Sequence, residues 1–475
     1  MRFHVAGLSL AVLAFSLGSA SDPRLGGLFL VRDIDAAPNG SSDPRDLIPF
    51  EGYLFFTALD GAGVRGIWKT DGTSAGTALI KDFPTPPPYE PSPSYGPISL
   101  TLVKGRLLFW NSVPNESGLW TTDGTAEGTS LLHSFGGFPV SLTKVDETLF
   151  FLGDDGVHGL EIWKSDGTVA GTVLVKDAAP GSQSPFHLVF PMMAASSGGK
   201  YFVTAWAPGV GNELWVSDGT DSGTHLVKDI YPGSGDSLPH DLTDVDGTLF
   251  FFADDNGHGS ELWKSDGTEA GTILVKDINP GMANSVAFYA MQSLNHLAYF
   301  LADDGIHGAE LWKSDGTAGG TVLVKDIQMG PGGSFPTPLA SLDGILFFSA
   351  DDGVHGQALW RTDGTPSGTA LVKAVEPGMD IIDAGGFLVF SASDGVHGQE
   401  VWVSDGTPAG TVRLADISPG ASSFSPTLFT RSGPFVFLSG DDGKTGRELW
   451  AFRVNGIDHV LSERSPRQIP FRPGH

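Results

Sequence analysis

The sequence contains no cysteine and comparatively few basic residues. Without cysteine the chain can form neither disulfides nor a lipid-modified cysteine, so packing must supply its stability. Its 28 lysine and arginine residues are outnumbered by 55 acidic ones, which gives a formal net charge of −27 at neutral pH. A surface with this charge repels phosphate backbones, and this argues against nucleic-acid binding.

The N-terminus has the pattern of a secretory signal peptide. Arg2 precedes an apolar stretch from Val5 to Leu17, and small residues follow up to Ala20. This order of charge, apolar run and small residues predicts cleavage after Ala20. The apolar run is shorter than the ~20 residues that a membrane-spanning helix requires. We therefore expect residues 1–20 to be removed and the mature chain to be exported to the cell surface, the extracellular space or the periplasm, without spanning a membrane.

Turn-forming residues are abundant, with 65 glycines and 32 prolines beside 31 phenylalanines and 11 tryptophans. The apolar content of 40% is sufficient for a packed core. Frequent turn residues between apolar segments predict many short strands rather than helices.

One phrase recurs along the chain. Asp-Gly-Thr follows a tryptophan by three residues eight times, and each time it continues as D-G-T-x-x-G-T. The eight tryptophans are Trp68, Trp120, Trp163, Trp215, Trp263, Trp312, Trp360 and Trp402. A ninth unit contains Trp450 but lacks Asp-Gly-Thr. The tryptophans recur about every 48 residues, a period typical of the blades of a β-propeller.

Each unit divides into four strand-like pieces. In the unit of Trp263 these are residues 242–245, 248–254, 261–266 and 272–278. Asp246-Gly247, between the first two pieces, is a two-residue hairpin signal. The second piece is continuously apolar, which is typical of a strand that is buried on both faces between neighbouring sheets.

We therefore predict an all-β fold in which residues 21–456 form a β-propeller of four-stranded antiparallel blades. Nine repeat units predict nine blades, and eight blades with one irregular unit are the alternative. Residues 28–34 match the fourth piece that the ninth unit lacks, so the N-terminal strand is expected to close the ring. Residues 457–461 are a second candidate for that strand, within a C-terminal tail of residues 457–475.

At "ELWKSDGTEAGT" the sequence resembles the ELWxxDGT-repeat family of exported bacterial proteins, which are sometimes labelled hyalin-like. The resemblance covers nearly the whole mature chain. It implies the repeat architecture and a location at the cell surface. It implies no catalytic residues, because the family carries no agreed biochemical activity.

An acidic hairpin, Asp-Asp-Gly-x-His-Gly, recurs less strictly than Asp-Gly-Thr. Paired carboxylates beside glycines suit calcium, which binds six to eight oxygens. The candidate ligands are Asp154, Asp155, Asp303, Asp304, Asp351 and Asp352. One hairpin offers only two carboxylates, so we favour a turn with at most weak calcium binding and expect no other cofactor.

Signals for catalysis are weak. The hairpin histidines, His158, His258, His307, His355 and His397, occur once per unit and are predicted to lie too far apart to share a zinc ion. The sequence also lacks a P-loop and a G-x-S-x-G motif in a strand-to-helix context.

Departures from the repeat are better guides to function, because packing does not require them. Trp206 stands where other units have the first hairpin aspartate. Asn111 to Gly118 replace the acidic hairpin of the second unit, and a proline-rich connection contains Tyr89 and Tyr95. We predict that Trp206, Tyr89 and Tyr95 share one face of the propeller and bind a ligand. The alternative is that the proline-rich insert packs over a blade edge.

The sequence favours a non-enzymatic, exported scaffold for adhesion or for recognition of a carbohydrate or a protein. The alternatives are a propeller enzyme that acts on carbohydrate, either a hydrolase or a lyase, and a structural component of the matrix. The scaffold is favoured because the acidic residues follow the repeat, whereas catalysis usually needs one asymmetric cluster.

Overall fold

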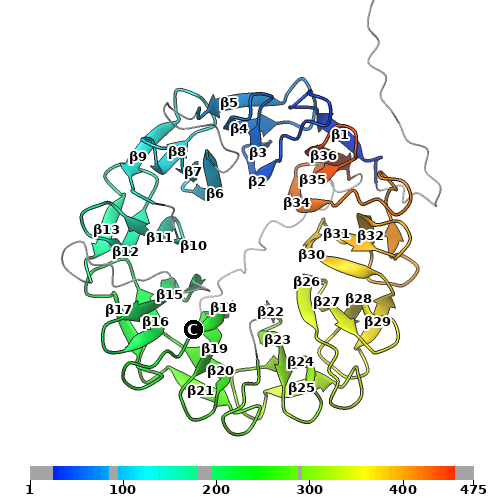
Figure 1. The fold of residues 1–475 in the computed structure, drawn as a ribbon. Coiled ribbons are helices and arrows are strands. Elements are labelled where there is room, and N and C mark those ends of the chain that lie inside the picture. Colours follow the sequence, from blue (N-terminus) through cyan, green and yellow to red (C-terminus); the bar gives the residue numbers. More distant parts are fainter. Residues whose placement is uncertain (1–24, 85–94, 138–139, 179–193, 287–290, 455–475) are drawn as a thin grey trace, which may run out of the picture.

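The computed structural model describes residues 25–84, 95–137, 140–178, 194–286 and 291–454. Within these residues the chain forms nine four-stranded antiparallel sheets that follow one another around a ring (Figure 1). The protein is thus a β-propeller of nine blades, as the repeat count predicts, and the alternative of eight blades is wrong.

The first five blades each consist of four consecutive strands. Blade 1 contains β2 (Arg45–Phe50), β3 (Tyr53–Leu59), β4 (Arg65–Thr70) and β5 (Ala78–Asp82). Blade 2 contains β6 (Pro97–Val103), β7 (Arg106–Asn111), β8 (Gly118–Thr122) and β9 (Ser130–Ser134). Blade 3 contains β10 (Val140–Val145), β11 (Thr148–Asp154), β12 (Leu160–Ser165) and β13 (Val173–Lys176). Blade 4 contains β14 (Ala194–Ser197), β15 (Lys200–Ala207), β16 (Gly211–Ser217) and β17 (His225–Lys228). Blade 5 contains β18 (His240–Val245), β19 (Thr248–Asp254), β20 (Ser260–Ser265) and β21 (Ile273–Lys276).

Blades 6 to 8 repeat this plan, and blade 9 takes its fourth strand from the N-terminal region. Blade 6 contains β22 (Gln292–Leu294), β23 (Leu297–Asp303), β24 (Ala309–Ser314) and β25 (Val322–Lys325). Blade 7 contains β26 (Thr337–Leu342), β27 (Ile345–Asp351), β28 (Gln357–Thr362) and β29 (Ala370–Lys373). Blade 8 contains β30 (Glu376–Asp383), β31 (Leu388–Ser393), β32 (Gln399–Ser404) and β33 (Val412–Arg413). Blade 9 contains β34 (Thr427–Ser432), β35 (Phe435–Asp441), β36 (Arg447–Arg453) and β1 (Phe29–Arg32).

The N-terminal strand closes the ring. β1 pairs antiparallel with β36, and Leu30 lies opposite Trp450. The prediction that residues 28–34 complete the ninth unit is therefore confirmed. Residues 457–461, the other candidate for this strand, lie outside the described residues, as do the predicted signal peptide and the rest of the C-terminal tail. Closure gives blade 9 its fourth strand and joins the two ends of the repeat array.

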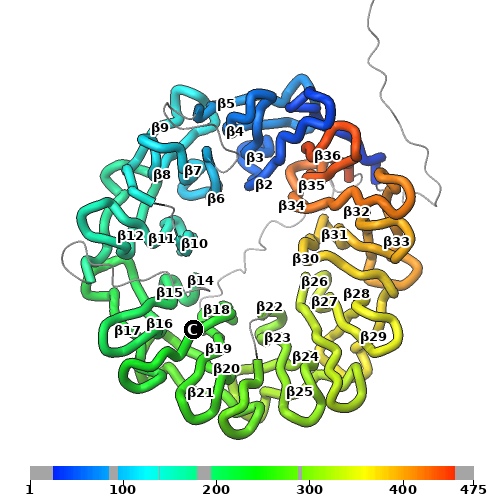
Figure 2. Tube along the Cα trace, viewed as in Figure 1, coloured from blue at the N-terminus to red at the C-terminus, as the bar shows by residue number. Residues whose placement is uncertain are grey.

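Local sequence sets the turns within a blade. Val245 pairs with Thr248 across the two-residue turn of Asp246 and Gly247, whose φ angles are 51° and 81°. Aspartate and glycine tolerate such positive angles, and these angles match the twist of a short hairpin. The first strand of each blade lies innermost, so that the nine first strands surround the centre of the ring (Figure 2).

The core is divided among the blade interfaces. Nine clusters of buried apolar side chains each join two neighbouring blades. Trp312 of blade 6, for example, is 6% exposed and packs with Phe252 and Leu262 of blade 5. Trp263 of blade 5 packs against Phe202 and Leu214 of blade 4 in the same way. The repeated tryptophan is therefore an inter-blade residue, and apolar burial between sheets stabilises the ring.

Candidate functional site on the hairpin face

One face of the ring carries the hairpins between second and third strands together with the connections between blades. Since the strands of each blade run antiparallel, the first hairpins and the Asp-Gly-Thr turns lie on the opposite face. Backbone hydrogen bonds join a hairpin to the connection beside it. The amide of Asp303 donates to the carbonyl of Ser285 at 2.8 Å, and the amide of Asp351 donates to that of Ser334 at 2.9 Å. We call this surface the hairpin face.

The hairpin of blade 6 shows how Asp-Asp-Gly-x-His-Gly is used. One oxygen of Asp303 accepts the amide of Gly305 at 2.8 Å. One oxygen of Asp304 accepts the amides of Ile306 and His307, and the other lies 2.8 Å from Nδ1 of His307. Gly305 has a φ of 76°, which glycine adopts without strain. The hairpins that begin at Asp154 and Asp351 contain the same bonds. The paired carboxylates thus serve their own turns.

These bonds also shift the pKa values of both partners. Burial raises the pKa of Asp304, but the hydrogen bonds from the amide and ring of His307 outweigh burial, so the pKa lies below its ordinary value. The bond to Asp304 raises the pKa of His307. Among the described residues, no group of three or more histidine or acidic side chains is arranged to hold a metal ion. Calcium binding by Asp154, Asp155, Asp303, Asp304, Asp351 and Asp352 stays a prediction.

A set of buried glutamates anchors the connections, and sequence reasoning missed their role. Glu261 is completely buried; its two carboxylate oxygens accept the amides of Ile278 at 2.8 Å and Asn279 at 3.2 Å. The completely buried glutamates at this position of the third strand are Glu161, Glu213, Glu261, Glu310, Glu400 and Glu448. Burial raises the pKa of Glu213, Glu261, Glu400 and Glu448 to about 7. The available signal was a charged residue placed directly before an apolar residue and a tryptophan in several units.

The Asp-Gly-Thr turns lie on the opposite face and are stabilised by hydrogen bonds of their own side chains. One oxygen of Asp315 accepts the amide of Thr317 at 2.9 Å and the Thr317 hydroxyl at 2.7 Å. The buried hydroxyls of Ser314 and Thr321 lie 2.7 Å apart and join the third strand to the start of the fourth. Each side chain of the repeated phrase therefore has a structural task in the turn.

Two of the three aromatic residues that were predicted to bind a ligand, Trp206 and Tyr95, lie in different blades. Trp206 lies opposite Asn212 in blade 4, at the position that Asp254 holds in blade 5, and it is partly buried. Tyr95 precedes the first strand of blade 2, and blade 3 lies between blades 2 and 4. Both residues lie at the hairpin-face ends of their strands, but they do not form one site. Tyr89 lies outside the described residues.

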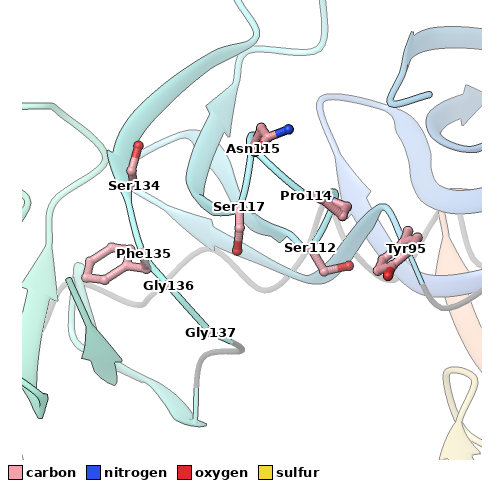
Figure 3. A pocket seen from close by; sticks show the side chains of 9 residues that line it. All are labelled: Tyr95, Ser112, Pro114, Asn115, Ser117, Ser134, Phe135, Gly136 and Gly137. Carbon is pink, nitrogen blue, oxygen red and sulfur yellow. The ribbon is translucent and has the colours of Figure 1, made fainter. Parts of the chain in front are cut away.

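Tyr95 borders a cavity of about 460 Å³ on the hairpin face of blade 2. Every loop that blade 2 contributes to this face lines the cavity (Figure 3). The lining residues are Tyr95, Ser112, Pro114, Asn115, Ser117, Ser134, Phe135, Gly136 and Gly137. Blade 2 is the unit whose acidic hairpin is replaced, so the cavity lies where the sequence departs from the repeat.

Gly118 explains why blade 2 differs from blades that carry the buried glutamate. It occupies the glutamate position, and a Cβ there would lie 2.2 Å from the carbonyl oxygen of His133. In blade 2 the backbone of the fourth strand therefore occupies the space that the glutamate side chain takes in those other blades. The chain then continues through Phe135, whose amide donates to the carbonyl of Ser117 at 3.2 Å. This bond fixes the exit connection against the hairpin and holds the two sides of the cavity together.

On one side of the cavity the lining residues pack against and bond to the rest of the fold. On the other side, polar side chains have no hydrogen-bond partner within the described part of the chain. Tyr95 packs against the apolar cluster between blades 1 and 2, and Ser112 exchanges hydrogen bonds with the backbone of Gly96. Among the described residues, Asn115, Ser117 and Ser134 form no side-chain hydrogen bond. Asn115 can donate and accept, as can both serines. The described residues of the lining carry no carboxylate, ammonium or imidazole, so it suits an uncharged polar ligand.

A second cavity, of about 180 Å³, lies on the opposite face between blades 5 and 6. Its charged groups are paired with neighbours. Nδ1 of His296 lies 2.5 Å from a carboxylate oxygen of Asp246, and Lys264 donates to the carbonyl of Gly316 at 2.8 Å. It is smaller and these side chains already bond to neighbours, so the Tyr95 cavity is the better candidate site.

Comparison with known proteins finds only distant structural neighbours. Neither a family model nor a curated protein matches the sequence. A puromycin hydrolase is similar in structure over 86% of this chain and 59% of its own, with 13% identity and a TM-score of 0.37. Oligopeptidase B from Leishmania major matches over 76% of this chain and 54% of its own, with 10% identity and a TM-score of 0.40. The β-propeller domain of the trilobed protease from Pyrococcus furiosus matches over 72% of this chain and 96% of its own, with 11% identity and a TM-score of 0.33.

The chain thus spans 59% of the length of the puromycin hydrolase. At these TM-scores the neighbours give no argument about activity. In the described part of the chain, no helix is long and apolar enough to cross a membrane.

Proposed function

We propose that this nine-bladed propeller is an exported, non-enzymatic recognition scaffold, and that it binds a carbohydrate in the Tyr95 cavity at the cell surface. The observation that carries the proposal is the composition of this cavity, which combines an aromatic ring with free hydroxyl and amide groups. Sugars present apolar C–H faces and neutral hydroxyls, which such a lining complements. Export is supported by the pattern from Arg2 to Ala20.

The regularity of the ring supports recognition over catalysis. The hairpin carboxylates accept bonds from their own turns, and the turn carboxylates on the opposite face do the same. A rigid ring in which one blade departs from the repeat provides a fixed frame for one binding site, since loops on a rigid scaffold commonly carry function. A proposed role in adhesion follows from this geometry together with export.

A glycan array tests the proposal directly. The wild-type protein is compared with Tyr95→Ala and Asn115→Ala, and Tyr53→Ala on the opposite face serves as the aromatic control. We expect wild-type binding to a restricted set of neutral glycans, with affinity reduced about tenfold or more by either cavity substitution. Equal binding by all four proteins would place recognition elsewhere.

The same glycans test the enzymatic alternative. They are incubated with the wild-type protein, and shorter or unsaturated products are sought by mass spectrometry. The proposal predicts intact glycans. Cleavage products that depend on the protein would make it a hydrolase or a lyase and would contradict a purely recognitional role.

A further inference from the structure

Exposed apolar side chains gather on the hairpin face of three consecutive blades. Six lie on hairpins of blades 6 to 8 or on the connections that lead into blades 6 and 7, and the seventh, Met379, lies in the irregular first part of β30: Met282, Ile306, Met329, Phe335, Val354, Met379 and Val396. We call this set the apolar arc. Met329 is 89% exposed, Val354 80% and Met282 75%. Single exposed apolar side chains are ordinary, but a large contiguous group of them commonly marks an interaction site.

The distribution of exposure around the ring is uneven. Among the described large apolar side chains, eight are more than three-fifths exposed, and six of these belong to the apolar arc. The other two are Val157, on the hairpin of blade 3, and Val169, in an Asp-Gly-Thr turn on the opposite face. The turn bonds of the hairpin explain its aspartates and glycines, but they do not require an aliphatic residue at Ile306 or Val354.

The segments of the arc are neighbours in space. A Cβ on Gly305, in the hairpin of blade 6, would lie 2.9 Å from the side chain of Asn279, in the connection that carries Met282. A Cβ on Gly308 would lie 2.6 Å from the amide of Gly333, in the next connection. That connection also reaches the hairpin of blade 7, where the Gln328 side chain lies against Gly353. From the connection of Met282 to the hairpin of Val354, hairpins and connections therefore alternate along one continuous surface.

The charge around the arc has one sign. Lysine and arginine are absent from the connections of residues 277–286, 326–336 and 374–375, from residues 376–379 at the start of β30, and from the hairpins of residues 303–308, 351–356 and 393–398. These segments do contain eight acidic residues: Asp277, Asp303, Asp304, Asp326, Asp351, Asp352, Glu376 and Asp394. With a net charge of −27 the chain repels a second copy of itself and anionic surfaces alike.

We propose that the apolar arc docks a segment of a partner protein in which lysine or arginine side chains flank apolar ones. The apolar side chains of such a segment cover Met282, Ile306, Met329 and Val354, and its cations lie beside the hairpin carboxylates. Methionine suits this task, because its flexible side chain adapts to different apolar partners. Opposite charge accelerates the encounter and fixes the orientation of the partner. The arc lies across the ring from blade 2 (Figure 2), so this docking is independent of the Tyr95 cavity.

Binding of short helical peptides to the full mature chain tests the proposal. The probe is a fluorescent amphipathic peptide of leucine and lysine, and the comparison peptides replace lysine by glutamate or leucine by serine. Fluorescence anisotropy is measured on the wild type, on the triple variant Ile306→Ser/Met329→Ser/Val354→Ser, and on Val169→Ser as the matched control. We expect the triple variant and the leucine-free peptide each to weaken binding about tenfold or more, with Val169→Ser unchanged.

Four outcomes would overturn the proposal. Equal binding of the probe to the wild type and the triple variant would show general attraction to an acidic protein. Equal binding of the glutamate peptide would remove the role of charge. Tight binding of a synthetic peptide of residues 455–475, or adsorption of the wild type but not the triple variant to uncharged lipid vesicles, would assign the arc to the chain's own tail or to a membrane instead.

Discussion

The buried glutamates make stability depend on pH in a direction that the structure determines. Burial raises the pKa of Glu261 from 4.5 to about 7. The folded state then holds the proton more tightly than the unfolded chain, so this contribution is fully present below about pH 4.5 and is lost as pH rises through about 7. A shift of this size corresponds to at most about 3 kcal/mol per carboxyl group.

The substitution Glu261→Gln isolates one such group, because glutamine does not titrate. It keeps one acceptor for the amides of Ile278 and Asn279 and loses the other, so we expect it to destabilise the fold at about pH 5. Toward about pH 8 the wild type must bury a charged carboxylate, and the deficit of the variant should shrink by up to about 3 kcal/mol. Equilibrium urea unfolding, followed by tryptophan fluorescence at each pH, measures the difference.

Glu269→Gln is the matched control, because Glu269 lies exposed in an Asp-Gly-Thr turn of the same blade. This substitution removes a carboxylate without removing a buried acceptor, and the variant's free energy of unfolding is measured over the same pH range. A constant difference between Glu261→Gln and the wild type across the range would refute the reasoning, since it would mean that Glu261 titrates equally in the folded and unfolded chains.

Three further predictions concern the fold and its ligands. Deletion of residues 25–34 should lower the melting temperature, because it removes the strand that pairs with Trp450, and an unchanged melting curve would contradict closure. Trp312→Ala should cost about 3–5 kcal/mol in urea unfolding, since the side chain is buried between blades, and a neutral effect would mean that it is dispensable there. Calcium added to metal-stripped protein should raise the melting temperature little, because both oxygens of Asp304 already accept bonds; micromolar affinity in calorimetry with a large rise would make calcium a structural cofactor.

The sequence was most informative where the repeat and its physical cause coincide. A tryptophan about every 48 residues predicts blades, and Asp246-Gly247 predicts a turn because few residues accept its positive φ angles. Closure followed from a missing fourth strand. The role of Glu261 could not be predicted in this way. Its hydrogen-bond partners, Ile278 and Asn279, lie beyond the next strand of the chain, so the contact depends on how the blade folds.

The candidate site was only partly accessible to prediction. The replaced hairpin and Tyr95 both marked blade 2, and the structure brings them together around one cavity. Trp206 departs from the repeat just as clearly, but it lies in blade 4, away from the cavity. Two departures from a repeat do not by themselves show that the residues concerned lie close together. The apolar arc was hidden as well, since whether Ile306 or Val354 is exposed depends on the shape of the hairpin and not on its composition.

We propose that recognition takes place at the cavity of blade 2, where the ring departs from its repeat. A crystal structure of the protein with the glycan that binds most tightly on the array tests it most directly. We expect electron density for a sugar beside the Tyr95 ring, within hydrogen-bonding distance of Asn115, Ser117 or Ser134. Density for the sugar at another place, such as the Asp-Gly-Thr face, with this cavity unchanged, would contradict it.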